Sequence, residues 1–100
     1  MSQIPRLEKI KDVLNKNKGL LQSEYKVKRL GVFGSYARGD YAQGSDLDIL
    51  VEFYETPDIF EFIRFEEFLR NLLGIKVELV STKALKSLIK DEILKETVYI

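Results

Sequence analysis

The stretch that decides the fold reads Gly34-Ser35-Tyr36-Ala37-Arg38-Gly39-Asp40-Tyr41-Ala42-Gln43-Gly44-Ser45-Asp46-Leu47-Asp48. A short apolar run at 30–33 leads into it, and a second one at 49–51 leads out of it. This pattern predicts a strand over 27–33, a tight turn, and a second strand over 46–53. The loop between the strands is too long for a tight hairpin. The two strands can still pair antiparallel, with the turn at their shared end.

The rest of the chain alternates helical and strand patterns. This alternation favours an α/β (or α+β) domain with one small sheet, spanning residues 1–100. The expected elements are, in order, a helix that holds Pro5 in its first turn and runs to Lys18 before Gly19, a connection over 20–26, the two strands already described, a helix over 59–73 between Thr56-Pro57-Asp58 and Gly74, a strand over 75–80, a short capped turn over 81–85, a helix over 87–95, and an edge strand or packed tail over 98–100.

Composition excludes several kinds of chemistry. The chain carries 16 Lys and Arg against 16 Asp and Glu, with no cysteine and no histidine. This excludes a disulfide framework, a thiolate zinc site and a histidine general base. Any metal must be held by oxygen ligands, which favour magnesium, manganese or calcium. Zero net charge gives no overall attraction to nucleic acid or to an anionic membrane. We expect no direct nucleic-acid binding, no membrane span and a cytoplasmic location.

Two carboxylates close the deciding stretch. Asp46 and Asp48 are two apart on a predicted strand, so both side chains point to one face of the sheet. Neighbouring carboxylates repel each other, and a site that keeps both ionised normally holds a cation. Magnesium fits because it is bound through one or two carboxylates together with phosphate oxygens and water. The plainer alternative is a solvated strand edge with two exposed aspartates.

The small residues before the acids suit a phosphate. Gly34 lets the backbone approach a ligand closely, and Ser35 adds a hydroxyl donor beside the exposed amides of a helix start. An ordinary junction between a strand and a turn is the alternative. Arg38 can reach a phosphate in the same site, or it can lie on the surface paired with Asp40. Two glycines allow the following loop to fold tightly, and Ser45 can fix its end before the aspartates.

A third acid comes from a later strand. Glu78 lies in the strand predicted over 75–80. If this strand lies beside the one with Asp46 and Asp48, the three acids can hold one or two magnesium ions and orient an attacking hydroxyl. The alternative is an outward-facing residue of an alternating strand. Each of these features alone occurs easily by chance. Their occurrence together in this order is much rarer, and it favours a combined phosphate and metal site.

The run Gly34-Ser35-Tyr36-Ala37-Arg38-Gly39, followed by Ser45-Asp46-Leu47-Asp48-Ile49, resembles the signature of DNA polymerase β-like nucleotidyltransferases. It is most similar to the minimal nucleotidyltransferases (MNT), single small domains that are often antitoxins of HEPN ribonuclease toxins. The resemblance covers nearly the whole chain and implies a small mixed sheet flanked by helices. It implies that Gly34 and Ser35 hold the triphosphate tail and that Asp46 and Asp48 bind magnesium. The third family acid, usually aspartate, falls on Glu78. Similar antitoxins transfer AMP from ATP to a tyrosine of the toxin.

An acceptor has to bring its own binding surface, because a domain this small has little surface left to enclose one. The predicted helix over 59–73 carries more apolar residues than one buried stripe requires, and the surplus is either a partner surface or part of a small core. A small core also favours a permanent partner or oligomerisation. We therefore expect a magnesium-dependent nucleotidyltransferase that acts on a hydroxyl of a partner protein. The alternatives are a non-catalytic antitoxin that blocks its toxin sterically, and transfer to a small molecule such as an aminoglycoside.

Overall fold

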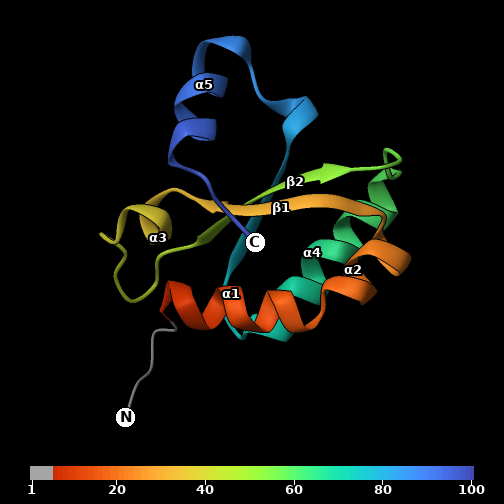
Figure 1. Ribbon diagram of the computed structural model, residues 1–100, viewed down its shortest axis with the longest axis horizontal. Coiled ribbons are helices and arrows are strands. Elements are labelled where there is room, and N and C mark those ends of the chain that lie inside the picture. Colours follow the sequence, from red (N-terminus) through yellow and green to blue (C-terminus); the bar gives the residue numbers. More distant parts are fainter. Residues whose placement is uncertain (1–5) are drawn as a thin grey trace.

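The structure is a computed structural model that describes residues 6–100. Helices and strands follow one another along the chain largely as the sequence indicates (Figure 1). They are α1 (Leu7–Lys16), α2 (Lys18–Tyr25), β1 (Val27–Phe33), α3 (Ser35–Arg38), β2 (Leu47–Phe53), α4 (Ile59–Leu73), β3 (Val77–Ser81), the short 3-10 helix η1 (Thr82–Ala84), α5 (Ser87–Glu96) and β4 (Val98–Tyr99). No helix within residues 6–100 is long and apolar enough to span a bilayer.

One four-stranded sheet, in the order β3-β2-β1-β4, organises the chain. β1 runs antiparallel to both β2 and β4, whereas β2 and β3 are parallel. Parallel strands need a long crossover connection, and α4 lies in the connection between β2 and β3. The sheet is therefore mixed and flanked by helices, which confirms the expected α/β fold class. The antiparallel pairing of β1 with β2 is confirmed as well.

One face of the sheet holds the hydrophobic core, and we call it the packed face. Leu47, Ile49 and Val51 of β2 are fully buried on it. They belong to one apolar cluster with side chains of α1, α2 and α4. Phe65 and Leu69 are the buried residues of α4, and they lie four positions apart on one side of the helix. This face gives the domain most of its stability, because apolar burial is the main favourable term in folding.

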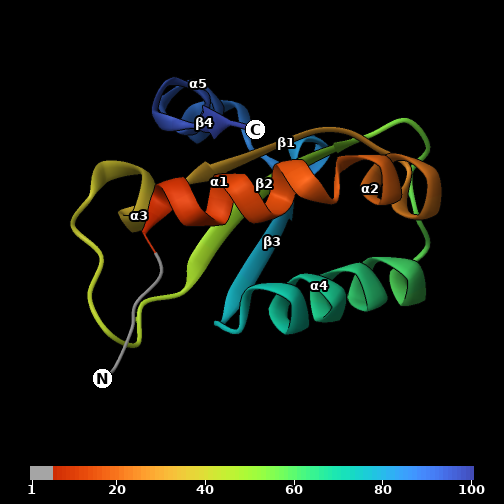
Figure 2. The same ribbon diagram turned by 60° about the horizontal axis from the view of Figure 1, so that its bottom comes forward.

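Alternate residues of β2 point to the opposite face, which we call the acidic face. It carries Asp48, Leu50 and Glu52 of β2, together with Glu78 of β3. α5 lies over this face, on the other side of the sheet from α4 (Figures 1 and 2). Among the ten described residues of α5 none is fully buried, and Leu88 is 92% exposed. The acidic face is therefore only partly covered.

The first helix ends earlier than the sequence indicates. α1 stops at Lys16 instead of Lys18, because Asn17 leaves the helical backbone region (φ −105°, ψ 12°). The side-chain amide of Asn17 donates to the carbonyl oxygen of Val13 at 2.8 Å. It therefore satisfies one of the carbonyl groups that a helix end leaves open. Pro5, which we expected in the first turn, lies outside the described residues.

The connection expected over 20–26 is wrong, because α2 occupies most of this segment. Gly19 lies inside α2 instead of stopping a helix. Leu21 is buried in the core, and tertiary burial of this kind outweighs the weak helix propensity of a single glycine. α2 ends at Tyr25, and Lys26 after it takes a left-handed backbone conformation (φ 58°) just before β1.

The remaining elements agree with the expectation apart from small shifts at their ends. α4 begins with a capping box, in which the Asp58 carboxylate accepts from the Glu61 N–H (2.8 Å) and the Glu61 carboxylate accepts from the Asp58 N–H (3.1 Å). It ends at Leu73, and Gly74 after it takes a left-handed conformation (φ 70°) that stops the helix, as expected. β2 begins one residue later than expected, so that Asp46 directly precedes the strand. β3 begins two residues later and ends one later, and the last residues form the expected edge strand.

Candidate active site

The junction at the end of β1 requires a glycine. Gly34 has a backbone conformation that only glycine adopts readily (φ 72°, ψ −150°). A Cβ atom at this position would also collide with the Oδ2 atom of Asp48. The contact arises because Phe33, the residue before, is paired with Asp48 across the β1–β2 ladder. The Gly-Ser motif and the Asp-x-Asp motif therefore meet directly at one end of the sheet.

The loop between the two motifs is held by its own residues. Tyr36 of α3 is buried and stacks on Tyr41, with the ring centroids 4.2 Å apart. Burial raises the pKa of the Tyr36 hydroxyl, which keeps this residue neutral. The Ser45 hydroxyl oxygen accepts from the Ala42 N–H at 3.0 Å, and the Ser45 N–H donates to the Ala42 carbonyl oxygen at 3.0 Å. Ser45 thus fixes the end of the loop before the aspartates, as expected.

The parallel pairing of β2 with β3 brings Asp48 and Glu78 side by side. This confirms the expectation that the strand with Glu78 lies next to the Asp-x-Asp strand. Burial, followed by the charge and hydrogen bond of Glu78, raises the pKa of Asp48 to about 6. The charge of Asp46 acts in the same direction, whereas Arg38 lowers this pKa. The site therefore concentrates negative charge that a cation would relieve.

Basic side chains that the sequence analysis missed lie beside these acids. Asp46 and Glu78 line a depression of about 410 Å³ together with Lys76, Arg70 and Glu66. Lys76 precedes Glu78 by two residues, and this spacing was the one sequence signal for it. Arg70 has no such signal, because it reaches the depression only through the packing of α4 beside β3. Arg70 already pairs with Glu66 at 3.4 Å and donates to the Val77 carbonyl oxygen at 3.2 Å, so its charge serves the packing of α4 on β3.

Arg38 is engaged by two carboxylates. Its Nε atom donates to Asp40 Oδ2 at 3.2 Å, and its Nη1 atom donates to Glu96 Oε2 at 3.2 Å. Hydrogen bonds to Asp40 and then to Glu96 raise the pKa of the guanidinium. The expected alternative of pairing with Asp40 is therefore confirmed for this structure. Glu96 also accepts from the Gly34 N–H at 3.0 Å, and the sequence carries no signal for this contact because 62 residues separate the two.

The three acids suit magnesium in their donor chemistry. Asp48 and Glu78 present carboxylates side by side, and Asp46 directly precedes the same strand. Within residues 6–100, no three acidic side chains are gathered closely enough to form a metal-binding group by themselves. Magnesium is normally held by one or two carboxylates plus substrate phosphates, and seldom by an all-protein cage. The residues therefore fit a magnesium ion that arrives with a triphosphate.

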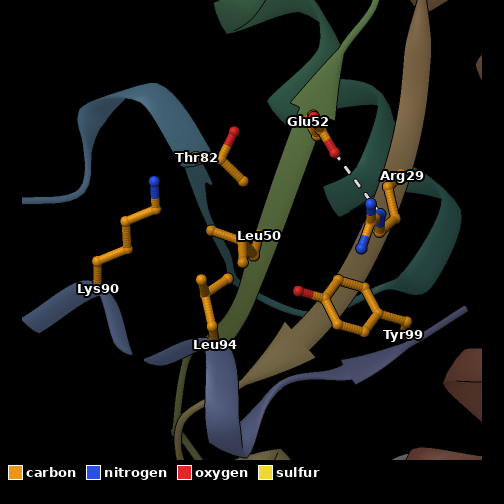
Figure 3. A pocket seen from close by; sticks show the side chains of 7 residues that line it. All are labelled: Arg29, Leu50, Glu52, Thr82, Lys90, Leu94 and Tyr99. Carbon is orange, nitrogen blue, oxygen red and sulfur yellow. Dashed lines mark ion pairs between the residues drawn. The ribbon is translucent and has the colours of Figure 1, made fainter. Parts of the chain in front are cut away.

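A second cavity lies on the acidic face beneath α5 (Figure 3). It measures about 240 Å³ and has Leu50 of β2 and Leu94 of α5 as apolar walls. On its other side, Arg29 lies 3.5 Å from the Glu52 carboxylate and 5.2 Å from the centre of the Tyr99 ring. Leu50 follows Asp48 by two residues and lies on the same face of β2, so the cavity adjoins the cluster of acids.

Fold and site together define a class of protein. A Gly-Ser turn after the first strand, an Asp-x-Asp pair at the start of the second, and a third acid on its parallel neighbour come together at one end of the sheet, as the resemblance to nucleotidyltransferases implies. The family model described as "Nucleotidyltransferase domain" matches residues 7–100. The chain therefore belongs to the nucleotidyltransferase domain family, and it is an enzyme of this class.

Relatives within the family are close in length to this chain. The chain is 50% identical over 95 residues to the predicted protein adenylyltransferase MJ0128 of Methanocaldococcus jannaschii, covering 94% of this chain and 97% of the relative. It is 46% identical over 94 residues to the protein adenylyltransferase MntA of Thermococcus cleftensis, covering 94% and 95%. These relatives place the chain among the MntA-like members of the family.

Solved structures share the fold. One described as a predicted minimal nucleotidyltransferase superposes with a TM-score of 0.81 at 31% identity, covering 97% of this chain and 98% of that one. A toxin–antitoxin complex with AMP-PNP contains a chain that superposes with a TM-score of 0.71 at 25% identity, covering 85% and 69%. The minimal nucleotidyltransferase architecture implied by the motifs is thus confirmed.

Proposed function

We propose that this protein is a magnesium-dependent adenylyltransferase that moves AMP from ATP to a hydroxyl of a partner protein. The observation that carries the proposal is the meeting of Asp48 with both Gly34 and Glu78 at one end of the sheet. A turn that can approach phosphate and a pair of carboxylates thus lie in contact, as transfer at the α-phosphorus requires. The names of the two relatives support AMP as the transferred group and a protein as the acceptor.

On the phosphate side of the site, the turn after β1 holds the triphosphate tail. Gly34 leaves room for close approach, and Ser35 supplies a hydroxyl and an amide as donors. Arg38 offsets part of the phosphate charge, using donors that Asp40 does not occupy. Ser45 acts indirectly by fixing the loop that joins the turn to the acids.

On the metal side, Asp46, Asp48 and Glu78 are the proposed ligands. Bound magnesium supplies charge neutralisation at the attacking and leaving oxygens. The carboxylates orient the acceptor hydroxyl, whose oxygen attacks the α-phosphorus while a site carboxylate takes its proton. The bond from this phosphorus to the bridging oxygen breaks, and pyrophosphate leaves with the electron pair.

The proposed acceptor is a HEPN-type ribonuclease toxin, for which this chain is the antitoxin. The solved toxin–antitoxin complex with AMP-PNP supports an antitoxin role, and the HEPN type of toxin is what the family resemblance implies. Exposed apolar side chains of α4 offer a surface for a partner, namely Ile59 (64% exposed), Phe60 (73%) and Ile63 (45%). A reaction that consumes ATP also fits the expected cytoplasmic location.

Label transfer tests the proposal directly. The protein is incubated with magnesium, ATP labelled at the α-phosphate, and a HEPN-type protein from the same genome as the candidate partner. We expect label on a hydroxyl of that protein and loss of its ribonuclease activity. ATP labelled at the γ-phosphate is the matched control and should leave no label, because AMP and not phosphate is transferred. Absence of α-label from this partner would contradict the proposal.

The non-catalytic alternative also has one observation in its favour. Arg38 donates to Asp40 and Glu96 in this structure, so only part of its hydrogen-bonding capacity is left for a phosphate. The double variant Asp46→Asn/Asp48→Asn separates the two functions. Full neutralisation of the toxin by this variant, without label transfer by the unmodified protein, would favour steric blocking over catalysis.

A further inference from the structure

A single carboxylate from the end of α5 binds both ends of the proposed phosphate-binding turn. Glu96 Oε1 accepts from the Gly34 N–H at 3.0 Å, and Glu96 Oε2 lies 3.2 Å from Arg38 Nη1. We infer that Glu96 is a positioning residue that holds the Gly34 amide and the Arg38 guanidinium in place for the triphosphate. This inference rests on the proposed function, because it concerns the phosphate side of that same site.

The backbone fixes the place of Glu96 independently of its own side chain. Glu96 is the last residue of α5, and β4 begins two residues later. β4 pairs antiparallel with Gly31 and Val32, close to the end of β1. A Cβ atom on Gly31 would collide with the side chain of Thr97, so glycine at this position lets the chain pass closely over β1. The carboxylate is therefore delivered to the turn by strand pairing.

Gly34 needs such support because glycine is the most flexible residue. Its conformation (φ 72°, ψ −150°) is one of several that glycine adopts readily. The Asp48 side chain restricts it from one side, and the bond to Glu96 restricts it at the amide. Without Glu96 this partly buried N–H loses its partner in the structure and the turn gains freedom. Affinity for the triphosphate then falls, because the turn has to be ordered on binding.

The guanidinium of Arg38 is arranged by the same carboxylate. Glu96 takes Nη1 and Asp40 takes Nε, which leaves Nη2 unused by either acid. About half of the Arg38 side chain is exposed, and exposed ion pairs of this kind add little to stability. The main consequence of the Glu96 contact is therefore a fixed direction of the guanidinium, which a phosphate can use through Nη2.

Simple electrostatics predicts the opposite effect, and this makes the inference testable. If Glu96 were only a negative charge beside an anion site, or an internal competitor for the phosphate, its removal would strengthen triphosphate binding. If it positions the turn, its removal weakens binding. The sign of the change in Kd separates the two roles.

The experiment measures Kd for inorganic triphosphate and for ATP, both with magnesium, by calorimetry on the full chain. We expect Glu96→Ala to weaken both by about tenfold, because a hydrogen bond and the hold on Arg38 are lost together. Glu96→Gln should lose less, since its amide oxygen can still accept from Gly34. The matched control Glu92→Ala removes the same charge one turn earlier in α5, at an exposed residue, and should leave both Kd values unchanged.

A double-mutant cycle excludes a purely structural effect. Glu96→Gln acts on phosphate binding mainly through Arg38, so it should cost little more in the Arg38→Ala background. Equal losses in both backgrounds would overturn the inference, as would equal or tighter triphosphate binding by Glu96→Ala. Failure of the unmodified protein to bind triphosphate would instead overturn the proposed function. All variants are compared at a temperature at which circular dichroism shows them folded.

Discussion

The packed face and the acidic face of the sheet use neighbouring residues of one strand in opposite ways. Leu47, Ile49 and Val51 are fully buried against three helices, whereas Asp48 and Glu52, which alternate with them along β2, point to the partly covered side. α5 and η1 lie over that side, and the structure leaves a cavity of about 240 Å³ that Thr82 of η1 and Leu94 of α5 help to line. The comparison teaches that stability comes mainly from one face, which leaves the other free to hold concentrated charge.

Removing a site acid should have the largest effect. Asp48→Asn is expected to lower AMP transfer by about a thousandfold. The variant loses a proposed magnesium ligand, and with it much of the neutralisation of negative charge at the α-phosphate in the transition state. The folded state should survive, since the packed face is untouched. Label transfer and thermal unfolding of the same preparation check both statements. Unfolding of the variant, in place of simple inactivation, would show that the two faces are not independent.

A cavity in the packed face should instead cost stability. Ile49→Ala is expected to lower the free energy of unfolding by about 3 kcal/mol, because Ile49 is fully buried in the core and its loss leaves a cavity there. Urea unfolding measures this loss. Transfer activity per folded molecule should stay close to that of the unmodified protein. A loss below about 1 kcal/mol would contradict the assignment of stability to this face.

Gly34 joins the two faces at the end of β1, so its substitution should affect both properties. Gly34→Ala is expected to destabilise the protein by about 2 kcal/mol, because its φ is positive and the new Cβ displaces Asp48. Transfer should fall as well, since Asp48 moves. Denaturant unfolding and label transfer report the two effects. Normal activity in this variant would show that the contact between Gly34 and Asp48 is dispensable.

In the metal-free protein, the charge of Asp48 on the acidic face should lower the free energy of unfolding in a pH-dependent way. The folded pKa of Asp48 is raised to about 6 by burial, Glu78 and Asp46, with Arg38 opposing, whereas an unfolded aspartate titrates near ~3.9. Between these values the folded state binds the extra proton, so the contribution of Asp48 to stability falls as pH rises through about 6. Below ~3.9 both states are protonated and the contribution no longer changes.

The size of this contribution should be about 1 kcal/mol, because partial exposure screens the charges. It is measured in EDTA as the difference in unfolding free energy between the unmodified protein and Asp48→Asn, from pH 7.5 to 4.5. The variant should be the more stable of the two at pH 7.5, and the difference should shrink on acidification. A difference that is constant with pH would exclude Asp48 as the titrating group.

The smallest effect is expected on the outer side of α5. Leu88 is 92% exposed, so Leu88→Ser should change the free energy of unfolding by less than about 0.5 kcal/mol. This variant is the counterpart of Ile49→Ala. Each variant removes apolar carbons, Ile49→Ala from the packed face of the sheet and Leu88→Ser from the helix over the acidic face. Urea unfolding is again the measurement. A large loss would mean that α5 supports the fold more than its exposure indicates.

Much of the fold was predictable from local patterns. The strands on either side of the deciding stretch, the limits of α4 and the Gly-Ser and Asp-x-Asp motifs all follow from short-range spacing and from capping residues. The prediction failed over 20–26, where Gly19 was interpreted as a stop. There the burial of Leu21 in the core stabilises the helix. Burial against elements that are remote in the chain cannot be read from the residues around Gly19.

The candidate site was predictable only in part for the same reason. The spacing of the Gly-Ser and Asp-x-Asp motifs, together with the family resemblance, predicted which residues of this stretch would form the site, whereas the direct contact of Gly34 with Asp48 is seen only in the structure. The other contacts of the site depend on which elements pack together. The packing of α4 places Arg70 beside the acids, and the position of α5 places Glu96 within hydrogen-bond distance of Gly34. Such contacts across the chain have no fixed spacing, so a single sequence does not reveal them.

By itself, the sequence determined the strands, the turn and the direction of Asp48 away from the packed face, because side chains alternate along a strand with a period of two. Only the tertiary structure decided that β3 lies parallel to β2, with Glu78 beside Asp48. It also decided that Glu96 closes on Gly34 and Arg38. The physical reason is that strand pairing and helix docking depend on the combined burial of residues far apart in the chain, and no local pattern contains that free energy.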